Sequence, residues 1–367
     1  MSDKRIIITV INNLVSDNRV HKMAGYLENR GYEVWMVGRT WPGGQIPSGR
    51  PGRVFRFRML FHKGVLFYLC MNIRLFLFLT THRCNRIMAV DLDTLPACVL
   101  AGWLKRIPVI MDSHELFTEI PELQHRLIKK RIWQWIEAFF IRRISAGITV
   151  SPGLVKIYKE RYNKEFLLVR NVPDITGGLM ELRATADKPT IYYQGALNVG
   201  RGLESAIKAL VYLPGYRMVI VGDGDIASSL RQMAVDLMVD NRVVFVGKVP
   251  FEELHKFIIG AHIGLCLLEN IGLNYYHSLP NRIFDYPLAG LPVLASAFPD
   301  ISEVVSQHET GLLTETLDPQ KIAELIKKAC EDFHLRHHWS RMLPLAASIF
   351  SWEKETRILD DLFPIIS

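Results

Sequence analysis

Short apolar runs alternate with stretches in which apolar residues recur every three or four positions. Residues 6–10 form a nearly continuous apolar run, and the residues after Asp17 place Val20, Met23 and Leu27 at helical spacing. A strand covered on both faces reads as an unbroken apolar run, whereas an amphipathic helix has a period of about 3.6. The alternation predicts strand–helix–strand units, which are typical of α/β folds with parallel sheets and right-handed crossovers.

A second series of such units spans residues 189–295, and the sequence Asn-Val-Pro-Asp at 171–174 precedes it. We predict that 171–174 is a hinge between two domains, because 367 residues suffice for two α/β domains of ordinary size. The predicted domains are residues 1–174 and 175–345. The last residues, 346–367, are predicted to form an amphipathic helix.

The composition indicates a well-packed protein that suits an anionic partner. Hydrophobic residues make up 49% of the chain and charged residues 22%, which favours a large core over disorder. The net charge of +7 and the pI near 9.1 suit nucleotide phosphates, lipid diphosphates or an acidic membrane face. Nucleic acid is not expected as a partner, because the basic residues are scattered and no nucleic-acid-binding motif is present.

The five cysteines show no Cys-x-x-Cys pair and no metal-ligand spacing. They are predicted to be reduced core thiols of a cytosolic protein. The first residues, Met-Ser-Asp-Lys-Arg, run straight into the first strand without the pattern of a signal peptide. We therefore expect a cytoplasmic location.

Residues 64–81 are strongly apolar, yet we predict a core or interfacial helix rather than a membrane span. Asn72 and Arg74 lie near the middle of the segment, where a charge is costly in a bilayer. Cations and aromatic residues are interleaved over residues 53–86, which would suit nucleic acid but fits anionic lipid better beside an apolar helix. We hypothesise peripheral docking on the inner face of the plasma membrane.

Two sets of polar residues in the first half follow predicted strands. Arg19 and Lys22 lie at the start of the first helix and belong either to a solvated face or to the lining of a ligand cleft. His114 directly follows the predicted strand at 109–111, and residues at the carboxyl ends of parallel strands face the ligand crevice. The alternative for His114 is a local hydrogen bond that shapes the turn.

Asp-x-Asp sequences occur twice, at Asp91 and Asp93 and again at Asp223 and Asp225. Such pairs can bind a metal ion, but the pattern is short and common. Asp93 also fits a helix N-cap before Leu95. We therefore expect no metal ion and no other cofactor.

The loop after the predicted strand at 189–193 carries glycines, Asn198 and a cation. Gly195 and Gly200 allow the backbone to approach a ligand closely, and Arg201 lies at the start of the next helix. A diphosphate bound here would accept hydrogen bonds from backbone amides and from a fork-shaped guanidinium.

A second loop, at residues 269–281, joins an apolar strand to a short helix. A loop that leaves the carboxyl end of a parallel strand and enters a helix is where α/β proteins bind phosphorylated ligands. Asn281, Arg282 and Asp285 bring an amide, a cation and a carboxylate to this place. The alternative is a purely structural connection.

The sequence Ser-Leu-Pro-Asn-Arg-Ile-Phe-Asp-Tyr at 278–286 favours a functional loop. It resembles the donor-sugar loop of retaining glycosyltransferases of family 4 (glycosyl transferases group 1). The resemblance spans nearly the whole chain, strongly over residues 192–292 and more weakly before Asp91. It implies an α/β protein of the GT-B fold, in which two Rossmann-like parallel-sheet domains face a central cleft and a C-terminal helix crosses back.

The resemblance also implies roles for individual residues. The family has two acidic residues separated by seven others, and here Asp285 takes the distal place, which contacts ribose hydroxyls. His277 takes the proximal place, which contacts the sugar ring. Arg201 stands where the family has a lysine and Ala196 where it has an arginine, so one phosphate-binding cation is missing.

Further roles follow from the same resemblance. The donor-binding residues are expected to be Gly195, Asn198, Gly200, Gly222, Gly224, Lys248, His277, Asn281 and Arg282. His114 is expected to reach the donor sugar, and Lys248 to lie beside the nucleobase. Arg19 and Lys22 are expected on the acceptor side, and Arg19 or Arg282 is expected to replace the missing cation.

The implied activity is metal-independent, retaining transfer of a sugar from a UDP- or GDP-linked donor. The implied acceptor is a lipid-linked or polysaccharide intermediate in the synthesis of a bacterial capsule, exopolysaccharide or lipopolysaccharide. His114, Arg201 and Asp285 are the candidate catalytic residues. Two alternatives stay open, a nucleotide-sugar epimerase of the same fold and a non-catalytic scaffold of a polysaccharide assembly complex.

Overall fold

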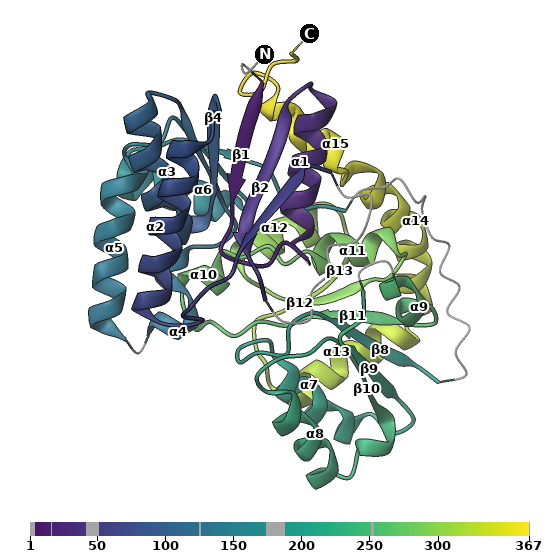
Figure 1. The fold of residues 1–367 in the computed structure, drawn as a ribbon. Coiled ribbons are helices and arrows are strands. Elements are labelled where there is room, and N and C mark those ends of the chain that lie inside the picture. The colour runs from purple at the N-terminus through teal and green to yellow at the C-terminus, as the bar shows by residue number, and fades with distance from the viewer. Residues whose placement is uncertain are drawn as a thin grey trace. The chain divides into compact units, whose positions relative to one another are not determined.

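The computed structural model describes residues 4–15, 17–41, 51–124, 126–173, 188–250 and 253–366. The chain divides into two compact units, each with its own parallel sheet (Figure 1). Unit 1 comprises Met1–Arg170 and Thr356–Ser367, and unit 2 comprises Asn171–Glu355. The predicted α/β class with two parallel sheets is confirmed.

Unit 1 contains a seven-stranded sheet in the order β3-β2-β1-β4-β5-β6-β7, with all neighbouring strands parallel. Its strands are β1 (Arg5–Thr9), β2 (Glu33–Arg39), β3 (Arg53–Phe57), β4 (Arg86–Val90), β5 (Val109–Ser113), β6 (Ala146–Thr149) and β7 (Phe166–Leu168). Its helices are α1 (Asn18–Asn29), α2 (Val65–Thr81), α3 (Asp91–Lys105), η1 (Phe117–Glu119), α4 (Pro121–Gln124), α5 (Leu127–Ile141), α6 (Pro152–Tyr162) and η6 (Arg357–Leu359).

The apolar runs of unit 1 become its central strands. Ile6, Ile7 and Ile8 of β1 are fully buried between β2 and β4, as an unbroken apolar run predicts. One face of the sheet shares a single apolar core with α2, α3, α5 and α6. Asp17 caps α1 by accepting a hydrogen bond from the backbone N–H of Val20 (3.2 Å), so the first helix begins where the sequence indicated.

Unit 2 contains a six-stranded parallel sheet in the order β10-β9-β8-β11-β12-β13. Its strands are β8 (Thr190–Gln194), β9 (Arg217–Val221), β10 (Val243–Gly247), β11 (Ile263–Cys266), β12 (Val293–Ser296) and β13 (Gly311–Thr314). Its helices are α7 (Leu203–Ala209), η3 (Leu210–Tyr212), α8 (Ala227–Asp236), η4 (Asp240–Arg242), α9 (Leu254–Ile258), α10 (Leu273–Tyr276), α11 (Arg282–Leu288), α12 (Pro299–Gln307), α13 (Pro319–Glu331), α14 (Phe333–Ile349) and α15 (Trp352–Thr356).

The chain passes between the units at two places, and both differ from the predicted boundaries. The first lies between Arg170 and Asn171, whereas the predicted boundary at 174/175 falls outside the described residues. The second lies between Glu355 and Thr356. The predicted C-terminal helix over 346–367 is broken in the structure, because α14 runs on to Ile349 with its buried side in the core of unit 2, and short helical turns follow it. Its predicted return to the first domain is seen from Thr356 onward.

The last residues pack on unit 1. Phe363 is fully buried and meets the rings of Tyr26 and Tyr32 edge-on, with centroids 6.4 and 6.1 Å away. Arg30 pairs with Asp360 (2.9 Å). The backbone N–H of Ile366 donates to the carbonyl of Arg30 (2.8 Å), which completes the return of the chain to unit 1.

The apolar segment at 64–81 forms α2, whose one side is buried. Among the described residues, no helix is both long and apolar enough to cross a bilayer. Part of the interleaved cation–aromatic segment is used inside unit 1, since Arg53 lies over the Trp35 ring (5.4 Å) and Phe55 packs against Phe78 (5.1 Å). The segment is therefore partly core, and its remaining exposed side chains lie mainly on and around α2.

Candidate functional site

Each sheet has a place where the order of its strands reverses. In unit 1 this place lies between β1 and β4, and in unit 2 it lies between β8 and β11. In open parallel sheets, ligands bind outside the carboxyl ends of the strands at such a reversal. Most of the predicted site residues lie on loops and helix starts that follow these strands and their neighbours.

In unit 2, the loops after β8 and β11 pack against each other. The backbone N–H of Glu269 donates to the carbonyl of Gly200 (2.9 Å), and the Tyr275 hydroxyl donates to the carbonyl of Val199 (3.3 Å). Gly200 has φ +83°, and a Cβ atom there would lie 2.6 Å from Ile271 Cδ1. The contact between the loops is therefore sufficient reason for this glycine, apart from any ligand.

Arg201 is half-buried at this edge. Its guanidinium carbon lies 4.8 Å from the centroid of the Tyr275 ring. Its Nε is buried and has no hydrogen-bond partner in the described part of the chain. A buried donor without a partner is costly, so the geometry suits an anion that accepts from Arg201.

Two carboxylates lie near the same loops. Burial and the neighbouring Glu204 carboxylate raise the pKa of Glu269. Oε2 of Glu204 is also buried without a partner in the described part of the chain. The edge thus combines a cation whose Nε lacks a partner with one glutamate, Glu269, whose negative charge is disfavoured by burial and by the neighbouring Glu204.

Arg282 is less accessible than the sequence indicated. It is 4% exposed, its Nη1 donates to the carbonyl of Gln194 (2.9 Å), and its guanidinium lies 4.6 Å from the Tyr193 ring centroid. Gly195 is exposed and lies next to this guanidinium, since a Cβ atom on Gly195 would be 3.1 Å from Nη1. Because Gly195 has no side chain, a ligand can come closer to Arg282 from this side. Arg282 Nε is also buried without a described partner. Arg282 therefore holds the end of β8 and retains one unsatisfied donor.

Asp285 belongs to a hydrogen-bond chain that the sequence did not reveal. Gln194 Nε2 donates to Asp285 Oδ2 (2.9 Å), and the Tyr192 hydroxyl donates to Gln194 Oε1 (3.1 Å). Gln194 is the last residue of β8 and is 9% exposed. The chain fixes the predicted ribose-binding carboxylate where the strand order reverses.

His277, which occupies a position where the family has an acidic residue, lies beside the carboxylate of another residue. Its Nδ1 lies 2.8 Å from Oδ2 of Asp300, which is 3% exposed and lies in the first turn of α12. Where the family pattern leads one to expect a single acidic residue, this chain has a histidine held by a buried aspartate. Sequence analysis missed Asp300, because it is 23 positions further along the chain.

The turn after β9 packs on the loop after β8. Gly222 has φ +144°, and a Cβ atom there would lie 1.9 Å from the carbonyl oxygen of Gly195. The backbone N–H of Leu197 donates to the carbonyl of Asp223 (3.1 Å). Gly222 is thus required by close backbone packing within unit 2.

Four further donor-side predictions are placed as follows. A Cβ atom on Gly224 would lie 2.6 Å from Asn198 Oδ1, so these two residues meet at the same packed turn. Lys248 is exposed after β10, and Asn281 is exposed directly before α11. Their contacts with a donor stay predictions.

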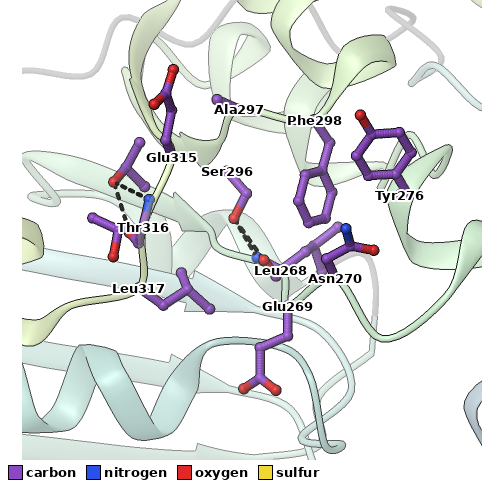
Figure 2. A pocket seen from close by; sticks show the side chains of 11 residues that line it. Leu268, Glu269, Asn270, Tyr276, Ser296, Ala297, Phe298, Glu315, Thr316 and Leu317 are labelled. Carbon is purple, nitrogen blue, oxygen red and sulfur yellow. Dashed lines mark hydrogen bonds between the residues drawn. The ribbon is translucent and has the colours of Figure 1, made fainter.

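A pocket of about 400 Å³ lies at the carboxyl ends of β11, β12 and β13 (Figure 2). Figure 2 shows Tyr276 and Phe298 on one side of it, and Ser296 hydrogen-bonded to the backbone of Leu268. Glu269 also lines the pocket. Within the described residues, none of the predicted donor-binding side chains lines it, so the pocket adjoins the predicted site.

At the reversal point of unit 1, charged residues form one network. Arg19 Nη2 lies 2.7 Å from Asp112 Oδ1, His114 Nε2 lies 3.1 Å from Asp112 Oδ2, and the His114 backbone N–H donates to Asp91 Oδ1 (2.8 Å). Arg19 also donates to the carbonyl of Val169 (2.8 Å) and is 2% exposed. The prediction that Arg19 lies on a solvated face is wrong, because Asp112 pairs with it inside the unit, and its acceptor-side role stays a prediction.

The network holds His114 in its charged form. Burial alone would lower the pKa of His114, but the carboxylates of Asp112 and Asp91 raise it to about 9. Burial would raise the pKa of Asp112, yet Arg19 and His114 hold it well below its usual range. His114 is 21% exposed, with ring nitrogens 3.1 and 4.0 Å from carboxylate oxygens. His114 is therefore a charged imidazolium that is held by two carboxylates and is still partly exposed to solvent.

Asp93 does not cap α3. The helix begins at Asp91, which has φ +58°, and Asp93 lies in the first turn with 5% exposure. Burial and the Asp91 carboxylate raise the pKa of Asp93 well above its usual value. Across the described ranges, no three His, Cys, Asp or Glu side chains are grouped as a metal site.

Lys22 is half-buried on α1, and its acceptor-side role stays a prediction.

Two family models match the chain. The model described as Glycosyl transferases group 1 matches residues 181–342, and the model described as Glycosyltransferase Family 4 matches residues 17–170. The first match falls within unit 2 and the second within unit 1. The resemblance drawn from residues 278–286 therefore extends to both halves of the chain.

Curated relatives match over part of their length. The lipopolysaccharide core biosynthesis glycosyltransferase LpsE of Rhizobium meliloti (strain 1021) is 25% identical over 203 residues, which cover 54% of this chain and 57% of the relative. A GDP-mannose-dependent alpha-(1-6)-phosphatidylinositol monomannoside mannosyltransferase of Mycolicibacterium smegmatis is 28% identical over 160 residues, 42% of each chain. The chain spans about half the length of the curated relatives it matches.

Solved structures share the fold over nearly the whole chain. Sucrose-phosphate synthase (tll1590) from Thermosynechococcus elongatus has a TM-score of 0.79 at 18% identity and 98% coverage of both chains. HepE of Anabaena, in complex with UDP and glucose, has a TM-score of 0.75 at 17% identity, covering 98% of this chain and 99% of that one. WaaG, a glycosyltransferase involved in lipopolysaccharide biosynthesis, has a TM-score of 0.76 at 14% identity, with 98% and 99% coverage. These likenesses show the predicted GT-B fold.

Proposed function

Because this chain belongs to the group 1 glycosyltransferases, we propose that it transfers a sugar from a nucleoside-diphosphate sugar to a lipid-linked or polysaccharide acceptor. The observation that carries the proposal is the pair of arginines, Arg201 and Arg282, where the strand order of unit 2 reverses. Each has a buried Nε without a hydrogen-bond partner among the described residues. A diphosphate would satisfy both.

The chemistry requires fixed positive charge. Breaking the bond between sugar and phosphate develops negative charge on the leaving diphosphate. Preorganised donors in a partly buried site stabilise such charge far better than water does. Arg201 and Arg282 are such donors, because Tyr275 and Gln194 hold their guanidinium groups in place. The proposal therefore includes no requirement for a metal ion.

Retention of configuration is part of the proposal. In a front-face displacement, the leaving phosphate itself assists the acceptor hydroxyl, and no enzyme nucleophile is needed. The protein then needs to orient the donor and stabilise charge, which suits a site built from arginines, amides and one histidine–aspartate pair. Asp285, held by Gln194, is assigned to the ribose hydroxyls, and His277, held by Asp300, to the sugar ring.

His114 is assigned to hydroxyls of the transferred sugar. It is charged at neutral pH, because the carboxylates of Asp112 and Asp91 raise its pKa to about 9 despite its burial. A charged imidazolium is a strong hydrogen-bond donor. Arg19 acts through Asp112 and is a positioning residue for His114.

The names of similar proteins support both common donor classes and a lipid-bearing acceptor. Similar solved structures of HepE contain UDP or UDP-glucose, and the relative from Mycolicibacterium smegmatis is named as GDP-mannose-dependent. The same relative is named for a phosphatidylinositol monomannoside, and LpsE for the lipopolysaccharide core. We propose that the chain acts in surface glycan synthesis at the cytoplasmic face of the membrane.

A nucleotide screen tests the donor assignment. The full chain is melted with UDP, GDP and, as a control, AMP. A nucleotide that binds at a hundredfold excess over its Kd should stabilise the fold by about 2.7 kcal/mol, and one of UDP or GDP should do so. Arg201→Ala should abolish the shift.

A product assay then tests the reaction. The chain is incubated with the matching sugar nucleotide and a membrane extract, with and without EDTA, and the anomeric configuration of the product is read by NMR. Transfer with retention in both conditions is expected. Conversion of the donor without an acceptor would indicate an epimerase, and binding of neither nucleotide would indicate a scaffold.

A further inference from the structure

The outer side of α2 is apolar. Val65, Leu69, Ile73 and Leu77 follow one another at intervals of four residues and are 71%, 55%, 51% and 55% exposed. The opposite side of the helix is apolar too and packs in the core of unit 1. A surface helix normally has polar residues on its outward side, whereas the outward side of α2 is apolar. The stripe therefore requires an explanation other than solvent exposure.

Two neighbouring helices extend the stripe. On α5, Ile128, Ile132 and Trp135 are 78%, 54% and 67% exposed, and on α3, Trp103 and Leu104 are 54% and 67% exposed. α2, α3 and α5 lie side by side on one face of the sheet of unit 1 (Figure 1). The exposed apolar residues named on these three helices are called the apolar face.

The charges on these helices are of one sign. All residues of α2, α3 and α5 are described, and their exposed charged side chains are Arg74, Lys129 and Arg131. The acidic residues of the same helices are buried or half-buried. Next to these helices, Lys63 lies two residues before α2 and Arg126 one residue before α5, and both are exposed, as is Glu122 on α4. The apolar face therefore stands among cations without an exposed carboxylate on its helices.

We infer that the apolar face inserts into the headgroup region of an anionic bilayer. Contiguous exposed apolar patches on soluble units mark interaction surfaces. A second copy of the chain would set like charges against each other, whereas anionic lipid accepts both features, with apolar side chains at the acyl boundary and cations at the phosphates. Trp103 and Trp135 also suit the interface, where tryptophan is enriched.

This surface differs from the one that the sequence suggested. The interleaved segment at 53–86 contributes the stripe on α2, but Arg53 and Phe55 are used within unit 1. The contribution of α3 and α5 comes only from the structure. The membrane contact stands independently of catalysis, and only its consequence, delivery of a lipid-linked acceptor, rests on the proposed function.

Vesicle flotation tests the inference. The full chain is mixed with vesicles of phosphatidylcholine alone or of phosphatidylcholine with phosphatidylglycerol. Binding to the mixed vesicles is expected, with loss at high salt and on the neutral vesicles. Failure to bind the mixed vesicles would overturn the inference.

Matched variants locate the contact. The double variant Ile73→Glu with Ile128→Glu should weaken vesicle binding by about tenfold or more. Met238→Glu and Leu345→Glu change residues of unit 2 that are 85% and 58% exposed, and both should bind as wild type. Lys129→Gln should weaken binding roughly fivefold. Equal binding by all variants would overturn the assignment to this face.

Two further measurements keep the test decisive. Light scattering reports whether the chain is a dimer that the double variant dissociates, and such a result without vesicle binding would assign the face to a second copy and overturn the inference. The thermal shift with UDP or GDP should be unchanged in the double variant, which shows that it is folded. That control also separates failure of membrane docking from failure of the proposed transferase activity.

Discussion

The two sheet edges differ in how their charges are paired. In unit 1, Asp112 pairs with both Arg19 and His114, and His114 also contacts Asp91, so the charges satisfy one another. In unit 2, Arg201 and Arg282 each keep a buried nitrogen without a hydrogen-bond partner in the described part of the chain. Charges that pair with one another within the protein fix the orientation of a side chain. Hydrogen-bond donors that have no partner in the protein are suited to bind an anionic ligand. The two halves of one fold thus carry different kinds of site.

The largest effect is expected from opening the closed network of unit 1. Asp112→Asn leaves Arg19 buried without its counter-charge, so the free energy of unfolding should fall by roughly 3–5 kcal/mol. Urea unfolding measures this loss. The control Glu33→Gln breaks the Arg5–Glu33 pair, which is 22% and 49% exposed, and should cost about 1 kcal/mol or less. Equal losses in both variants would contradict a closed network.

The open edge of unit 2 should respond in activity rather than in stability. Arg201→Ala should lower kcat with the sugar nucleotide by about 10²–10³-fold, because a donor to the leaving diphosphate is lost, while the melting temperature stays near that of wild type. The matched control is Arg231→Ala, since Arg231 also lies over a ring, that of Phe245 at 4.4 Å. Near-normal turnover of the Arg201 variant would contradict the assignment.

The pH dependence of stability sharpens the comparison. The two carboxylates outweigh burial and raise the pKa of His114 from 6.5 to about 9, so the charged form stabilises the fold. This contribution is complete below about pH 6.5 and is lost as the pH rises through 9, at most about 3 kcal/mol in all. His114→Gln should flatten the decline over this range, and His62→Gln, which changes an exposed histidine, should not. Parallel curves for wild type and the His114 variant would refute a charged His114.

The smallest effect is expected at the histidine–aspartate pair of unit 2. Asp300→Asn keeps a hydrogen-bond acceptor for His277 but removes the charge, so we expect a loss of about 1 kcal/mol in unfolding free energy. Asp236→Asn, at an exposed position on α8, is the control and should cost less. Calorimetry should also show weaker donor binding in the Asp300 variant alone. Unchanged donor affinity would mean that the pair supports the loop without orienting the sugar.

Much of the fold was predictable because its signals are local. β1 and β8 appear as apolar runs, since both faces of a central parallel strand are covered. The positions of His114 and Arg201 on loops and of Asp285 in the first turn of α11 were predictable as well, because the carboxyl ends of parallel strands share one edge. The C-terminal segment was predicted only in part, since α14 and α15 are separated at Phe350, which is buried against Phe284 of unit 2.

The pairing of polar residues was not predictable. Arg19 and Asp112 are 93 positions apart, and Gln194 and Asp285 are 91 positions apart. No periodicity connects such residues, because the sheet order decides which loops meet. Burial then decides the outcome, since an arginine that meets a carboxylate inside a unit is neutralised and one that meets only a ring and a carbonyl is not.

The amino-acid order alone was enough to establish the succession of strands and helices, the family-like loop at 278–286 and the presence of cations after particular strands. The tertiary structure decided which cation is paired with a carboxylate, as Arg19 is, and which keeps a donor without a partner, as Arg201 does. It also turned the apolar stripe of α2 outward beside α3 and α5. The reason is physical: backbone preference and apolar period act over a few neighbouring residues, whereas desolvation and charge pairing depend on atoms brought together from distant parts of the chain.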